Sequence, residues 1–171
     1  MVGGEPVPKV IAINQERCNG CQLCQIGCMA QKTGRAGLQI SRIRVDKRVD
    51  KLAEGGFVAL TCNHCDEPVC ATACLMEAIT KGEDGVTLRN ESLCIGCQAC
   101  VIVCPWGAVV LDPDRDVAVS CDLCSGEPYC VDICPTGALQ LASPKDISMK
   151  KRQFAAERIA LSGPNTSAAV L

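Results

Sequence analysis

Aromatic residues are scarce in this sequence: its 171 residues include two Phe, one Trp and one Tyr. Large aromatic side chains normally supply much of the buried area of a protein core. A conventional core built around them is therefore excluded, and some other material must fill the interior. No stretch is both basic and interleaved with aromatic residues, so a nucleic-acid partner is excluded as well.

Long apolar stretches are also missing. No segment approaches the roughly 18 apolar residues that a membrane-spanning helix needs. The first nine residues contain neither an apolar run of signal-peptide length nor paired arginines. We therefore expect no membrane span, and we expect a protein of the reducing cytoplasm, where cysteines favour metal over disulfides.

Cysteine, by contrast, is abundant. The sequence contains sixteen cysteines, and all of them fall into four repeats that begin Cys-x2-Cys and end Cys-x3-Cys. The four motifs, numbered in chain order, are Cys18-Cys21-Cys24-Cys28, Cys62-Cys65-Cys70-Cys74, Cys94-Cys97-Cys100-Cys104 and Cys121-Cys124-Cys130-Cys134.

The spacing within each motif predicts iron–sulfur clusters. Three sulfurs from one short segment can wrap a single cubane, and Gly20 and Gly96 ease the turn in the first and third motifs. We expect the fourth cysteine at a helix start that points away, where it suits a second cluster, as in the bacterial ferredoxin pattern. Four motifs therefore predict four [4Fe-4S] clusters.

Two other uses of cysteine fit the spacing less well. A structural zinc site uses two Cys-x2-Cys pairs set well apart and has no use for a third cysteine so close by. Eight disulfides would require a secretory route, which the N-terminal residues do not indicate. With clusters bound, the formal charge of −2 would become about −10, so basic side chains near the clusters should matter.

The segments between the motifs predict short strands joined by tight turns. Asp84-Gly85, between two β-prone runs, is a strong hairpin signal. In the longest gap, the apolar residues from Leu38 to Val45 indicate an extended or hairpin insertion, and Lys47 to Glu54 indicate a charged loop. The β-prone runs are residues 10–13, 57–60, 77–80, 86–88, 107–111, 117–119 and 138–141.

The C-terminal segment differs from the rest. Ser143 can cap a helix with Pro144 at its first position, and Gly163-Pro164 can stop the helix after about Leu161. Ile147, Phe154 and Leu161 fall on one narrow apolar stripe, which favours packing on a neighbouring subunit. We expect residues 165–171 to be loose.

The residues alone leave open which motifs share clusters. The 19 residues between Cys74 and Cys94 predict a hairpin, so the second and third motifs form a self-contained unit and the first and fourth close around it. Pro105 and Pro135 favour this nested pairing because each pair then contains one Cys-Pro step. The likeness of motif one to three and of motif two to four instead favours a duplicated half and tandem pairing.

The four motifs resemble those of the ferredoxin-type, four-cluster electron-transfer subunits of molybdenum and tungsten oxidoreductases. Such subunits accompany formate dehydrogenase, formate hydrogenlyase, dimethyl sulfoxide reductase and tungsten aldehyde oxidoreductase. The resemblance covers about residues 8–142 and implies nested pairing. The implied ligand sets are Cys18, Cys21, Cys24 and Cys134 for cluster 1; Cys62, Cys65, Cys70 and Cys104 for cluster 2; Cys94, Cys97, Cys100 and Cys74 for cluster 3; and Cys121, Cys124, Cys130 and Cys28 for cluster 4.

The fold class we predict is α+β, with two nested ferredoxin-like two-cluster modules, short hairpins and a C-terminal helix. Residues 1–61 and 105–142 would form the outer module, and residues 62–104 the inner module. Residues 143–171 would form the C-terminal helix and tail.

The resemblance implies an electron-transfer subunit that is not itself an enzyme. Its partner would be a large catalytic molybdenum or tungsten subunit, with tungsten aldehyde oxidoreductase favoured, and a flavin subunit or a ferredoxin could be the second partner. The alternatives are a freely diffusing polyferredoxin, or a subunit of a hydrogenase, formate dehydrogenase or carbon monoxide dehydrogenase. Stacking of the chain with itself is a further, less favoured alternative.

Two polar features besides the cysteines, one of them within the second motif, each have a structural and a functional interpretation. His64, the only histidine, is expected to be a partly exposed loop residue rather than a hydrogen-bonding neighbour that tunes a cluster potential. For one group of basic residues, a solvated face is favoured over a docking face. That group consists of Arg35, Arg42, Arg44, Lys47, Arg48 and Lys51.

Overall fold

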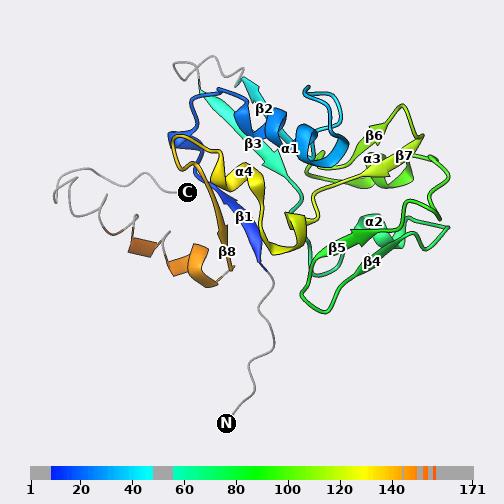
Figure 1. Ribbon diagram of the computed structural model, residues 1–171. Coiled ribbons are helices and arrows are strands. Elements are labelled where there is room, and N and C mark those ends of the chain that lie inside the picture. The colour runs from blue at the N-terminus through cyan, green and yellow to red at the C-terminus, as the bar shows by residue number, and fades with distance from the viewer. Residues whose placement is uncertain (1–8, 48–55, 144, 150–151, 154–155, 157–171) are drawn as a thin grey trace, which may run out of the picture.

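A computed structural model describes residues 9–47, 56–143, 145–149, 152–153 and 156. These residues form four two-stranded antiparallel sheets and a set of short helices. Figure 1 shows the hairpins and helices distributed around the molecule, without one large sheet among them. The prediction of a mixed α+β fold built from short hairpins is confirmed.

One sheet joins the two ends of the motif region. Strand β1 (Val10–Ile13) pairs antiparallel with strand β8 (Leu139–Ala142), with Val10 opposite Ala142 and Ile13 opposite Leu139. Beyond the strands, the Asn14 amide donates to the Ala138 carbonyl at 2.8 Å. Figure 1 shows the blue and golden strands side by side, so the first motif starts close to where the fourth ends.

The remaining sheets are formed by neighbours in the sequence. Strand β4 (Ile79–Lys81) pairs with β5 (Thr87–Arg89), and β6 (Val110–Asp112) pairs with β7 (Val117–Val119), as the turn signals predict. In the first of these hairpins, the Asp84 carboxylate accepts a hydrogen bond from the Val86 amide at 3.0 Å. This contact within the turn explains why Asp-Gly is a hairpin signal here.

The long insertion after the first motif also forms a hairpin. Strand β2 (Ile43–Lys47) pairs with β3 (Phe57–Thr61), and Ile43 lies opposite Thr61. Ile43, Val45 and Ala59 are buried against Ile11 and Leu139 of the first sheet. The charged loop between these strands, with Arg48 and Lys51, lies outside the described residues.

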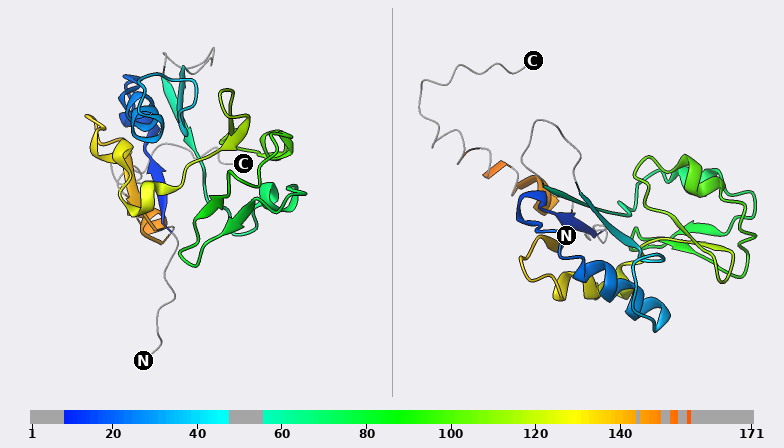
Figure 2. Two further views of the ribbon diagram at one scale, coloured as in Figure 1. Left: turned by 45° about the vertical axis from the view of Figure 1, so that its right-hand side comes forward. Right: turned by 90° about the horizontal axis from the view of Figure 1, so that it is seen from above.

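Each motif contributes one helix, and the helices pack in two pairs. Helix α1 (Leu23–Thr33) contacts α4 (Tyr129–Asp132), and α2 (Val69–Thr72) contacts α3 (Ala99–Val103). Two short 3-10 helices are also present: η1 (Gln15–Arg17) directly precedes the first motif, and η2 (Leu123–Gly126) lies in the fourth. Figures 1 and 2 show α2, α3 and β4 to β7 gathered on one side of the molecule, away from β1 and β8.

The position of the cysteines on these helices differs from the expectation. We expected the fourth cysteine of each motif at a helix start, and this is wrong. The third cysteine occupies the second helical position in every motif, because each helix begins with the last residue of the second spacer. The fourth cysteine follows one turn later, within α1 for Cys28 and at or just beyond the helix end for Cys74, Cys104 and Cys134.

The predicted C-terminal helix begins as expected. The Ser143 hydroxyl oxygen accepts from the Asp146 amide at 3.2 Å, and the Asp146 carboxylate accepts from the Ser143 amide at 3.3 Å. This reciprocal arrangement is a capping motif that stabilises a first helical turn. Residues 145–149, 152–153 and 156 are helical. The predicted first residue Pro144, the stripe residues Phe154 and Leu161, and the tail lie outside the described residues.

Candidate iron–sulfur cluster sites

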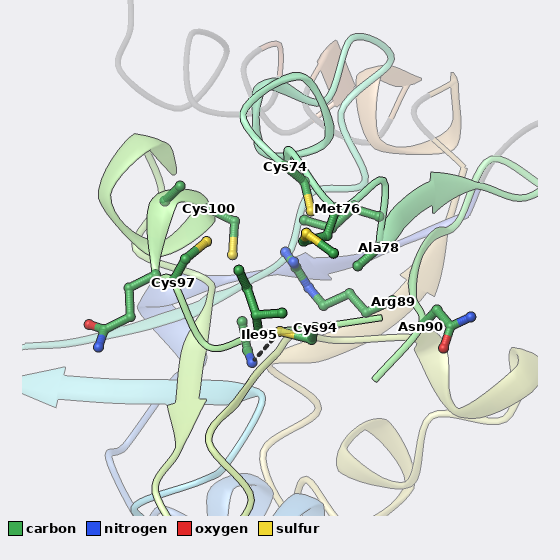
Figure 3. A pocket seen from close by; sticks show the side chains of 13 residues that line it. Cys74, Met76, Ala78, Arg89, Asn90, Cys94, Ile95, Cys97 and Cys100 are labelled. Atoms are coloured by element: carbon green, nitrogen blue, oxygen red, sulfur yellow. Dashed lines mark hydrogen bonds between the residues drawn. The ribbon is translucent and has the colours of Figure 1, made fainter. Parts of the chain in front are cut away.

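Four cysteines from two motifs surround a pocket beside helix α3, which we call the α3 pocket. Its sulfurs come from the end of α2 and from the turn that leads into α3, namely from Cys74, Cys94, Cys97 and Cys100. Figure 3 shows these side chains around a common space whose walls include Met76 and Ile95. The Ala118 amide donates to the Cys94 sulfur at 3.4 Å.

A second pocket of the same kind lies between helices α1 and α4, and we call it the α1–α4 pocket. Its cysteines are Cys28, from the first motif, and Cys121, Cys124 and Cys130, from the fourth. Its walls combine Ile11 and Ile43 with charged groups of Lys32, Arg42 and Asp122. Each pocket therefore draws three cysteines from one motif and the last cysteine from another.

The remaining cysteines lie near one another in two further groups. Burial raises the pKa of the Cys24 thiol to about 11, and the neighbouring thiols that raise it further are those of Cys21, Cys134 and Cys18. Burial also raises the pKa of Cys62, and Cys70 and Cys65 add to the effect. Cys70 and Cys104 pack against one apolar cluster with Ile79 and Val109.

Crowding of thiols has an electrostatic consequence. Burial raises the pKa of the Cys121 thiol to about 11, and it raises that of Cys130 further still, with repulsion from Cys121 and Cys28 added. A thiol is a metal ligand only as a thiolate, so these sites need strong positive charge to hold four thiolates together. Iron within a cluster supplies that charge.

The donor set does not suit a single metal ion. Among the described residues, no three His, Cys, Asp or Glu side chains converge closely enough to hold one ion. Four thiols spread around a shared space instead suit a polynuclear cluster, whose irons occupy separate corners. The residues present therefore fit the group that the motifs predict.

The turns within the motifs require glycine where we expected it. Gly20 and Gly96 have φ of +73° and +68°, a left-handed conformation that strains residues with a side chain. A Cβ atom at Gly20 would also overlap the Phe57 ring, and one at Gly96 would overlap the Asp116 carbonyl. Both turns can thus bring their cysteines around one site.

Backbone amides donate to several of the cysteine sulfurs. Besides the bond to Cys94, the Arg42 amide donates to Cys28 at 3.4 Å, and the Leu123 amide donates to Cys121 at 3.4 Å. Such donors stabilise negative charge on the ligand and shift the cluster potential. Sequence reasoning missed them, since every residue except proline carries an amide and only the fold decides where it points.

The environment of His64 differs from the one we expected. The side chain is 2% exposed, so the prediction of a partly exposed loop residue is wrong. Strand β5 covers it, and the Thr87 amide donates to its Nδ1 at 3.1 Å. Burial lowers the pKa of the imidazole, and the positive charge of Lys81 lowers it further. The ring is therefore held neutral, and the His64 amide itself donates to the Cys62 sulfur at 3.5 Å.

The basic residues do not form a uniformly solvated face. Arg35 and Arg44 are largely exposed and pair with Asp114 and Asp46, respectively, in line with the expectation. Arg42 departs from it, because its side chain is only 13% exposed. Its guanidinium lies 2.7 Å from the Asp122 carboxylate and 3.7 Å from Glu91. Arg42 thus stabilises the wall of the α1–α4 pocket.

Comparison with known proteins gives concordant matches. The sequence pattern of the 4Fe-4S dicluster domain matches residues 53–143, and that of the 4Fe-4S binding domain matches residues 15–30. A tetrathionate reductase subunit of Archaeoglobus fulgidus is 35% identical over 115 residues, which are 66% of this chain and 53% of that protein. Thiosulfate reductase electron transfer subunit PhsB of Salmonella typhi is 33% identical over 117 residues, which are 66% and 60% of the two chains.

The chain thus spans about half to three-fifths of the length of these relatives. Among solved structures, the active site complex BamBC of benzoyl coenzyme A reductase aligns with 91% of this chain and 96% of its own, with 24% identity and a TM-score of 0.46. No helix within the described residues is long and apolar enough to cross a membrane. The dicluster pattern covers more than half of the sequence, and the chain belongs to the 4Fe-4S dicluster domain family of iron–sulfur proteins.

Proposed function

We propose that this protein is an electron-transfer subunit that carries four [4Fe-4S] clusters and relays electrons between a catalytic subunit and a second redox partner. The observation that carries the proposal is the make-up of the two pockets, where three cysteines of one motif meet the last cysteine of another. This arrangement is the one by which two-cluster ferredoxins share ligands between clusters.

We propose the ligand sets that the family resemblance implies. The cysteines of the α3 pocket would hold cluster 3, and those of the α1–α4 pocket would hold cluster 4. The proximity of Cys134 to Cys24, Cys21 and Cys18 supports cluster 1. Cluster 2 would be held by Cys62, Cys65, Cys70 and Cys104, and the shared apolar environment of Cys70 and Cys104 supports it.

Nested modules follow from these ligand sets. The outer module would be built from residues 1–61 and 105–142, and the pairing of β1 with β8 and the contact of α1 with α4 support it. The hairpin of β6 and β7 in the second segment instead packs partly against the inner cysteines, through Val109, which directly precedes β6, and Ala118. The contact of α2 with α3 supports an inner module of residues 62–104. The outer module would combine two segments that are separated in the sequence. The inner module would be a single continuous segment between them.

The chain itself would not be an enzyme. With four cysteine ligands, each of the four irons of a cubane carries one thiolate at its external position. No iron is then left open to a substrate. A cluster exchanges one electron with little change in structure. A row of such clusters can therefore connect a buried catalytic metal with a distant acceptor in the reducing cytoplasm.

The partner we propose is a large molybdenum or tungsten subunit, with a tungsten aldehyde oxidoreductase as the specific candidate. Support comes from relatives named as subunits of tetrathionate and thiosulfate reductases. Exposed apolar side chains beside the α3 pocket also favour contact with another protein. They are Met76 and Ile95, which line the pocket, and Leu75, which directly follows Cys74 in the sequence.

Iron analysis and electron paramagnetic resonance (EPR) of the anaerobically purified chain test the proposal. Four cubanes require about 16 Fe per chain, and reduction should give signals from interacting clusters. Zinc in place of iron would refute the cluster assignment. Native purification then separates a subunit from a free carrier, because elution at 18.0 kDa, the mass of the chain alone, would refute the subunit proposal.

A further inference from the structure

Arg89 places a positive charge inside the α3 pocket. It is the last residue of strand β5 and pairs with Ile79 of β4, at the end of the hairpin that borders the pocket. Figure 3 shows its side chain running into the pocket, with the guanidinium group directed toward Cys74 and Cys100. Arg89 and Lys81 are the two Lys or Arg residues between Cys62 and Cys104.

The guanidinium is only partly satisfied by the protein. Its Nε donates to the Ser120 hydroxyl at 2.7 Å, whereas its Nη2 is buried without a hydrogen-bond partner. Among the described residues, no carboxylate pairs with it. A buried N–H left without an acceptor costs free energy, and a buried charge is normally paired. The position therefore suits a negative group, and no carboxylate of the described residues supplies one.

Other cations close to the cysteines are engaged elsewhere, including Lys32, which is paired with Asp122. Lys81 donates from its Nζ to the backbone carbonyls of Cys65 at 2.6 Å and His64 at 3.2 Å. Arg42 is paired with Asp122. Of the Lys and Arg side chains that line the two pockets, Arg89 is therefore the one without a carboxylate partner among the described residues.

The groups that surround Arg89 belong to several cluster sites. Burial raises the pKa of the Cys100 thiol, and the charge and a side-chain hydrogen bond of Arg89 act against that rise. Burial likewise raises the pKa of Cys62, where Arg89 again acts in the opposite direction. Ser120, its hydrogen-bond partner, directly precedes Cys121 in the sequence. Arg89 therefore lies where the inner cysteines approach those of the fourth motif.

We propose that Arg89 is the fixed counter-charge of the inner clusters and raises the reduction potential of the cluster held in the α3 pocket. This inference rests on the proposed function. Reduction adds one electron, and so one negative charge, to a cluster. A half-buried cation next to the ligands, with its Nη2 buried, stabilises the reduced cluster more than the oxidised one, and partial burial reduces screening by salt. Because arginine stays protonated, its contribution requires no proton uptake.

The test compares variants of the cluster-loaded full chain by redox titration followed by EPR. Arg89→Met removes the charge and the N–H donors while keeping an unbranched side chain. It should lower the equilibrium constant for one-electron reduction of one inner cluster about tenfold or more. This corresponds to a decrease of about 59 mV in the reduction potential of that cluster. Arg89→Lys keeps the charge and should retain most of the wild-type potential. Arg44→Met is the matched control, because it removes the same charge from a side chain that is 67% exposed.

The possible results separate this inference from the proposed function. A wild-type chain that holds no iron refutes the proposed function. A fully loaded Arg89→Met chain whose potentials shift no more than those of Arg44→Met refutes the role of Arg89 alone. If neither Arg89→Met nor Arg89→Gln retains the inner cluster, loading of Arg89→Lys supports the counter-charge, and failure of Arg89→Lys to load overturns it.

Discussion

The sharing of ligands between motifs predicts non-additive iron loss when cysteines are replaced in pairs. Cys28 belongs to helix α1 and Cys130 to helix α4, yet both line the α1–α4 pocket. If they hold one cluster, Cys28→Ser and Cys130→Ser should each remove the same four irons. The double variant should then lose no more iron than either single variant, which leaves about 12 of about 16 Fe.

Tandem pairing predicts a different result for the same double variant. Cys28 would then serve the cluster of the second motif, whereas Cys130 would still serve that of the fourth. Two clusters would be damaged, and only about 8 Fe would remain. The two pairings thus differ by a whole cluster.

A second double variant serves as the matched control. Cys24 and Cys28 lie one turn apart on α1, but only Cys28 lines the α1–α4 pocket, whereas Cys24 lies close to Cys134. Cys24→Ser with Cys28→Ser should therefore remove two clusters. The assay is iron per chain after anaerobic reconstitution, with the EPR spectrum of the reduced protein as a check on cluster type. Additive loss in the Cys28 and Cys130 pair would refute the nested ligand sets.

Three further predictions concern stability. Gly27→Ala places a methyl group 2.8 Å from the Tyr129 ring at the α1–α4 contact. It should lower the free energy of unfolding by about 1–3 kcal/mol. In urea unfolding, the penalty of Gly27→Ala should be smaller when Tyr129→Ala is also present. Burial opposes ionisation of Asp112, but hydrogen bonds from Arg115 and the Asp114 amide outweigh it and hold its pKa below the usual value. Asp112→Asn should therefore reduce stability at pH 7, and the difference from wild type should shrink as the pH falls below about 4 toward the folded pKa; a constant difference across that range would contradict the mechanism. Chelation of the iron should unfold the modules cooperatively in circular dichroism, because the thiol-lined pockets lack the side chains to fill themselves; an unchanged melting curve would contradict this dependence.

Much of the fold was predictable because local signals and tertiary structure agree. Strand β7 occupies the predicted residues 117–119, and the hairpin of β4 and β5 forms around the predicted Asp84-Gly85 turn. The capping role of Ser143 is also confirmed. In each case a short-range pattern, either a turn between β-prone runs or a capping side chain, determines the local structure without help from distant residues.

The expectations that failed depended on long-range packing. His64 sits in a polar-looking loop sequence, but β5 folds over it and leaves it 2% exposed. Arg42 lies in a run of basic residues, yet the fold brings Asp122 and Glu91 to it from far along the chain. Neither burial nor partner choice has a signature within a few residues.

The sequence by itself determined the chemistry of this protein. Sixteen cysteines at short, repeated spacings specify thiolate sites for iron–sulfur clusters, because a few residues suffice to wrap three sulfurs around one cubane. Only the tertiary structure decided what surrounds those sulfurs. Residues far apart in sequence place the Arg42 amide, the Ala118 amide and the guanidinium of Arg89 beside them, and these contacts depend on how strands and helices pack rather than on the motifs.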